Sequence, residues 1–160
     1  MLKICIMYNG LLHTHNLLRW IILILLFVAF YRHLLAKART FNATDRKIGR
    51  ILMISCDITF LIGLYQWITG ALGLKLIQSE GMSAVMKSRV YRFWAIEHTI
   101  GMLIAIILVH IGYSYAKKNI DDSIKHKRSM LFYGLALLII LISIPWPFRE
   151  LIGRPWFPGM

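Results

Sequence analysis

The chain alternates between long apolar runs and short polar segments. Four of the apolar runs contain about 20 residues each, the length that a helix needs to cross the hydrocarbon core of a bilayer. They cover residues 11–35, 51–74, 93–116 and 130–148. The pattern predicts an all-α fold in which residues 1–160 form one transmembrane four-helix bundle, with an interfacial tail at residues 149–160.

Composition favours the same class of protein. Hydrophobic residues make up 58% of the chain, and a soluble domain would have difficulty covering that much apolar surface. Cys5 and Cys56 fall on different segments, so no structural disulfide is expected. The start "MLKICIMYNG" is too short for a signal peptide, and the first helix is expected to serve as its own insertion signal, whether the chain starts at Met1 or Met7.

The net charge of +12 follows the loops of the predicted bundle. Eleven basic residues lie on one side of the membrane: Arg32, Lys37, Arg39, Arg46, Lys47, Arg50, Lys117, Lys118, Lys125, Lys127 and Arg128. Seven lie on the other: Lys3, Lys75, Lys87, Arg89, Arg92, Arg149 and Arg154. The positive-inside rule predicts that both termini are outside, on the periplasmic side. No soluble fold is present to carry a nucleic-acid surface, so no nucleic-acid partner is expected.

Ionisable side chains inside the predicted helices are the main indication of function. Each costs at least ~2.5 kcal/mol at the centre of a bilayer, so each needs a partner, a cavity or a cofactor. The set comprises His13, His15, Arg19, Asp57, Glu97, His98 and His110, together with the uncharged Gln66. Two other histidines have simpler interpretations: His33 extends to the interface beside Arg32, and His126 is a solvated loop residue.

Depth and helical phase select among these residues. At a rise of ~1.5 Å per residue, His15, His98 and Gln66 lie roughly 6, 8 and 12 Å inside the outer ends of their helices and form one layer. His15 and Arg19 are four residues apart and share a helix face, whereas His13 points elsewhere. His15 is therefore predicted to point inward.

The second helix presents small residues around an amide. Gly63, Gln66 and Gly70 follow helical spacing, which indicates either close helix packing or room for a flat macrocycle or a quinone ring. At the opposite end, Asp57 and His110 are secondary candidates for a proton-handling or structural pair.

Two histidines at matched depth, beside small residues and an arginine, are the arrangement that haem b requires. His15 and His98 would be axial ligands to the haem iron, and Arg19 would neutralise a propionate. The alternative is that both histidines only form hydrogen bonds within a wet bundle interior.

Four motifs carry a resemblance to a known family: "LHTHNLLRW", "GLYQWITG", "WAIEHTIGMLIAI" and "LISIPWPF". Together they resemble small four-helix bacterial inner-membrane proteins labelled cytochrome b-like. The resemblance covers nearly the whole chain and implies a haem-b or redox-chain association. His15, Arg19, Gln66 and His98 match the recurrent polar positions of that family.

These observations predict a multi-pass protein of the bacterial inner membrane. The first hypothesis is a haem-b electron-transfer protein associated with a respiratory or other energised membrane complex. The second is a non-catalytic accessory subunit of a larger complex, without its own cofactor. Lipid and other membrane-protein subunits are the expected partners, and a stand-alone enzyme is disfavoured because no nucleophile motif is present.

Overall fold

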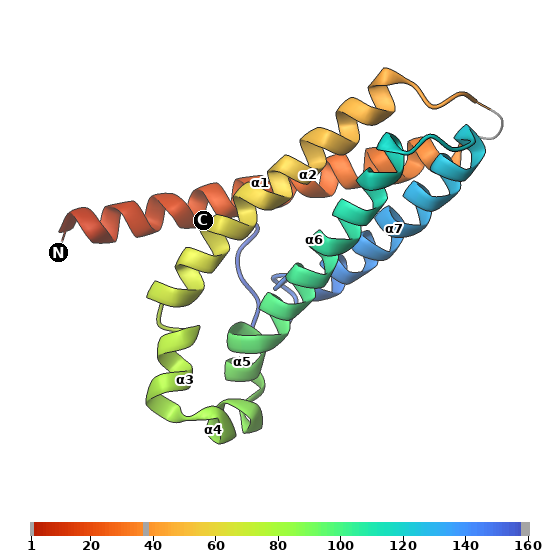
Figure 1. Cartoon of the computed structure of the whole chain (residues 1–160). Helices are drawn as coiled ribbons and strands as arrows, with labels where there is room; N and C mark the ends of the chain where they lie inside the picture. The colour runs from red at the N-terminus through yellow and green to blue at the C-terminus, as the bar shows by residue number, and fades with distance from the viewer. Residues whose placement is uncertain (1, 37–38, 158–160) are drawn as a thin grey trace.

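The computed structural model describes residues 2–36 and 39–157, and only the backbone of residues 2–6. Met1, Lys37 and Met160, which enter the sequence predictions, lie outside the described residues, as do the side chains of Lys3 and Cys5. The described part is all-helical, as predicted. The long helices are α1 (Leu2–Leu34), α2 (Ala43–Thr69), α6 (His98–Ser114) and α7 (Asp122–Ser143) (Figure 1). The described part of the chain also contains the short helices α3 (Leu74–Glu80), α4 (Met82–Lys87) and α5 (Arg89–Arg92), the π-helix η1 (Phe93–Glu97) and the 3₁₀-helix η2 (Tyr115–Lys117).

Four segments are long and apolar enough to cross a membrane, which confirms the predicted number of spanning helices. They are Met7–Leu34, Ala43–Glu80, Arg89–Lys117 and Asp122–Ser143. The second and fourth begin about two turns before the apolar runs at 51–74 and 130–148, because their basic first turns are also helical. At α2 the early start has a clear cause: Asn42 and Asp45 form a reciprocal capping box.

The long helices pack as a closed ring in which α1 contacts α2, α2 contacts α6, α6 contacts α7, and α7 returns to α1. Figure 1 shows α6 and α7 running side by side, with α3, α4 and α5 gathered at one end of the molecule. The segment between α3 and η1 contains two short helices, α4 and α5. We call this end of the bundle the His15 end and the opposite end the His33 end.

The centre of the ring is apolar and closely packed. Leu26, Leu52 and Val109 are fully buried there, and the side chain of Tyr133 lies against two glycines. A Cβ atom at Gly49 would lie 2.7 Å from the Tyr133 hydroxyl oxygen, and one at Gly112 would lie 2.7 Å from its ring. These glycines bring α2 and α6 close to Tyr133. The outer faces are apolar as well, which fits contact with lipid rather than water.

Two prolines determine how α7 ends. Helical carbonyls of Leu141 and Ser143 would normally accept hydrogen bonds from the N–H groups at positions 145 and 147, but Pro145 and Pro147 have none. The Trp146 indole N–H donates to the Leu141 carbonyl at 2.7 Å instead. The Ser143 carbonyl is left available to a side chain from another helix.

Candidate functional site

The helix phase of α1 places His13 and His15 in different surroundings. His13 is exposed, whereas His15 and Arg19 are partly buried toward the bundle. The imidazole of His15 lies against Gly63 on α2: a Cβ atom at Gly63 would be 3.2 Å from His15 Cε1 and 3.6 Å from its Nδ1. Gly63 therefore allows the His15 ring to approach α2 closely.

His98 is oriented by the carbonyl that the proline at position 147 leaves available. Its Nδ1 lies 2.8 Å from the Ser143 carbonyl oxygen, so Nδ1–H donates this bond and Nε2 is left with a lone pair. The rings of Phe93 and Trp94 lie 5.9 and 6.0 Å from the His98 ring. A backbone carbonyl that fixes the tautomer of a histidine is typical of histidines that bind metals.

The π-helix η1 directly precedes His98. Single turns of π-helix are frequent at functional sites. The Trp67 indole N–H donates to the Ala95 carbonyl in this turn at 2.9 Å, which ties the end of α2 to the start of α6. As a result, the helices that carry Gln66 and His98 meet at the His15 end.

Buried polar atoms without a hydrogen-bond partner gather at this end. Five such side-chain atoms occur in the described part of the chain, and four of them belong to His15 (Nδ1), Asn16 (Oδ1), Arg19 (Nε) and Gln66 (Nε2). An unsatisfied buried polar group costs about 1–3 kcal/mol, so these atoms call for a partner, such as water or a bound molecule, that the described residues do not supply.

The C-terminal tail lies across the same end, a feature that the sequence did not reveal. Asn16 Nδ2, Arg19 Nη2 and Trp20 Nε1 donate to the carbonyl of Trp156 at 3.2, 2.9 and 3.4 Å. The rings of Trp20 and Trp156 stack at 5.9 Å. The guanidinium of Arg154 lies 4.9 Å from the centre of the Trp94 ring. The tail thus packs on α1 and η1.

Two other predicted residues have local partners. Gly70 is the C-cap of α2, where a Cβ atom would lie 2.6 Å from the Tyr8 hydroxyl, so it contacts the first helix as well as Gln66. Glu97 accepts a hydrogen bond from Arg92 at 2.6 Å on the surface.

Asp57 and His110 meet at the α2–α6 contact. His110 Nε2 lies 2.8 Å from Asp57 Oδ1, and both side chains are about half exposed. The pair is on the outer surface of the bundle, away from the group of unpartnered atoms at the His15 end.

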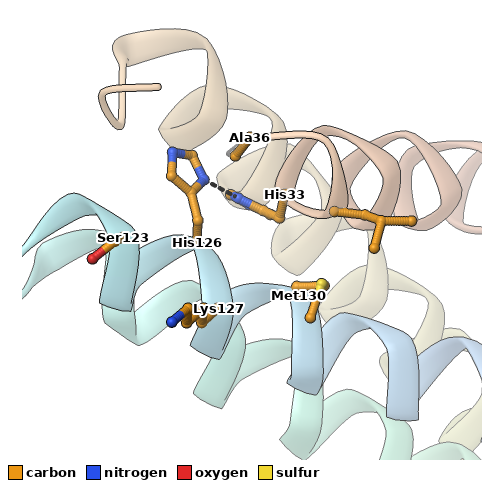
Figure 2. A pocket seen from close by; sticks show the side chains of 7 residues that line it. His33, Ala36, Ser123, His126, Lys127 and Met130 are labelled. Atoms are coloured by element: carbon orange, nitrogen blue, oxygen red, sulfur yellow. Dashed lines mark hydrogen bonds between the residues drawn. The ribbon is translucent and has the colours of Figure 1, made fainter. Parts of the chain in front are cut away.

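The interpretations of His33 and His126 were wrong. Both residues are buried, and His126 belongs to α7 rather than to a loop, because α7 begins at Asp122. Their Nδ1 atoms are 2.8 Å apart, and Figure 2 shows the two rings pointing toward each other beside a small cavity of about 170 Å³. The ring of Phe41 stacks on that of His33 at 5.7 Å.

A buried carboxylate holds the loop next to this pair. Asp45 is 3% exposed and accepts hydrogen bonds from Arg32 at 2.9 Å and Arg39 at 2.7 Å. The hydrogen bond to Asp45 raises the pKa of Arg39. The sequence analysis interpreted these arginines as topology signals and did not identify Asp45 as their partner. A capping-box pattern at 42–45 was the available indication.

The described residues contain no group of three or more His, Cys, Asp or Glu side chains arranged for a metal ion. Haem differs from a bare metal ion because the porphyrin supplies most of the iron ligands and the protein supplies axial side chains. Comparisons with protein-family models, curated proteins and solved structures find no match to this chain. The class that the fold defines is a multi-pass helical membrane protein.

Proposed function

We propose that this chain is a membrane-embedded electron-transfer protein that binds haem b at the His15 end, with His15 and His98 as the axial ligands. The observation that carries the proposal is the group of buried, unpartnered polar atoms around two partly buried imidazoles. The bacterial inner membrane, with both termini on the periplasmic side, is the location that the charge distribution favours. Subunits of a respiratory or other energised complex are the proposed partners.

The residues of this end fit haem b in kind. His98 has its Nδ1 committed to Ser143, which leaves Nε2 as the ligand atom and fixes the plane of the ring. Arg19 offers a cationic side chain whose Nε has no partner, which suits a propionate. Gln66 offers an amide N–H₂ donor in the same region. When bound, haem would supply one-electron redox chemistry.

The protein's own contribution is to control polarity and water access. Phe93 and Trp94 surround His98 with aromatic carbon, and the tail packs over Arg19 and Trp20. Apolar surroundings strengthen the effect of nearby charges because little water screens them. A single guanidinium at this position would therefore influence a redox potential measurably.

Haem extraction tests the proposal directly. Protein isolated in mild detergent with its native partners should release a non-covalent haem b on acid–acetone treatment, because the chain has no "CxxCH" motif to bind haem covalently. If gently isolated protein releases no haem, the accessory-subunit hypothesis replaces this one.

Replacing Arg19 should lower the redox potential without removing the haem. An uncompensated propionate would favour ferric iron, and the loss of one nearby cationic charge in a partly screened environment changes a redox potential by on the order of 50 mV. We expect this decrease for Arg19→Leu, and a much smaller change for Arg19→Lys, in a potentiometric titration.

The matched control is Asn16→Leu. Asn16 also donates to the Trp156 carbonyl but carries no charge, so this variant loosens the tail and leaves the charge in place. An equal decrease of the potential in the Asn16 and Arg19→Leu variants would show that the tail contact, and not a propionate partner, is responsible.

A further inference from the structure

A polar pair occupies the outward face of the α2–α6 contact at a depth where lipid is expected. Asp57 and His110 are joined at 2.8 Å, and each side chain is 44% exposed. Asp57 lies seven residues after Arg50 on α2, and His110 lies seven residues before Lys117, the first lysine after α6. At a rise of ~1.5 Å per residue, the pair is roughly 10 Å deeper in the membrane than those cations.

The residues around the pair are apolar and exposed. Ile54 and Leu61 follow the same face of α2 as Asp57, and Leu103 and Ile107 follow the same face of α6 as His110. Hydrocarbon chains offer no hydrogen-bond partner to the remaining polar atoms of the pair. A half-exposed Asp–His pair among exposed apolar side chains indicates that protein, and not lipid, covers this face.

We propose that this face binds a second copy of the same chain about a two-fold axis. The bond between His110 Nε2 and Asp57 Oδ1 leaves His110 Nδ1 and Asp57 Oδ2 without a partner in the hydrogen-bond network of the described residues. Across a two-fold axis, Nδ1 of each copy meets Oδ2 of the other. Such an interface is self-complementary, because the same patch supplies both the donor and the acceptor.

Proton counting supports this arrangement. Consider a pair that holds one proton more than a carboxylate and a neutral imidazole hold together. Each contact between an imidazole nitrogen and a carboxyl oxygen, within a chain or between chains, then has one donor and one acceptor. Either each imidazolium donates to two carboxylates, or each carboxylic acid donates to the imidazole of the other copy. In both cases the pair has no net charge, as the hydrocarbon interior requires. Because the face supplies both complementary groups, a second copy of the chain is the occupant that it fits. The proposed dimer does not depend on bound haem.

Cysteine cross-linking in membranes tests the proposal. In a chain with Cys5→Ala and Cys56→Ala, Ile107→Cys should form a disulfide-linked dimer on oxidation, since it lies one turn from His110 on the exposed face. The matched control is Ile24→Cys, which is 62% exposed on α1, diagonally across the ring. It should cross-link at least about ten-fold less.

A second pair of variants tests the role of the polar atoms. Asp57→Leu with His110→Leu makes the face fully apolar and should reduce cross-linking at position 107 about ten-fold, through the loss of two interchain hydrogen bonds. The exchanged pair, Asp57→His with His110→Asp, should restore most of it.

Three results would overturn the proposal. The first is equal cross-linking at positions 24 and 107 at low protein-to-lipid ratio, and the second is its absence at both. The third is cross-linking at 107 that the double leucine variant leaves unchanged. The comparison of positions 24 and 107 leaves the polar pair intact, so it remains decisive even if the leucine variant fails to fold.

Discussion

Under the proposed haem ligation, His98→Ala and His15→Ala should each abolish a low-spin haem-b spectrum. Loss of either imidazole would leave the iron five-coordinate or release the haem, because each side chain would supply one of the two protein ligands. The measurement is the visible spectrum of each purified variant, normalised to protein concentration. We expect a loss of the low-spin bands of about ten-fold or more.

His13→Ala is the matched control for this prediction. His13 is on the same helix, two residues from His15, but it is exposed. Its removal should leave the spectrum unchanged. Added imidazole should partly restore the spectrum of His98→Gly, which would separate loss of a ligand from loss of the fold. A spectrum retained in both the His15 and His98 variants, or lost only in the His13 variant, would show that the wrong face of α1 was chosen.

Asp45→Ala should lower the free energy of unfolding by about 2–3 kcal/mol, the largest effect that we expect outside the candidate haem site. The variant removes the buried acceptor shared by Arg32 and Arg39 and also half of the capping box that begins α2. Unfolding in mixed detergent micelles, followed by circular dichroism, would measure the loss.

Glu97→Ala is the control for the Asp45 prediction. Glu97 also pairs with an arginine, but its side chain is 46% exposed, and such surface pairs contribute about 1 kcal/mol or less. If Asp45→Ala is no more destabilising than Glu97→Ala, the buried network at the His33 end contributes little to stability.

The spanning helices could be predicted because their apolar length alone distinguishes them. The ends of the helices were predicted less accurately. Lys125, His126 and Lys127 are polar enough to suggest a loop, yet they belong to the first turns of α7. Lysine and histidine are compatible with a helix, so polarity marks the membrane boundary and not the helix boundary. The misplaced start of α7 is the reason that the pairing of His126 with His33 was missed.

The candidate site was predictable where helical phase decides and unpredictable where the chain folds back. The spacing of His15 and Arg19 gave their common face, and the exposure of His13 agrees with that phase. The Trp156 carbonyl belongs to the C-terminal tail, which is more than a hundred residues from α1 in the sequence. No local sequence pattern predicts that this tail packs on α1. Pro147 could have indicated a free carbonyl at Ser143, but not that His98 would use it.

The reduced-minus-oxidised visible spectrum of the wild-type protein, recorded with and without carbon monoxide, tests the central claim most directly. Two imidazole ligands leave no open position on the iron, so we predict sharp low-spin haem-b bands that carbon monoxide does not change. A spectrum without haem bands, or high-spin bands that shift with carbon monoxide, would contradict haem ligation by His15 and His98.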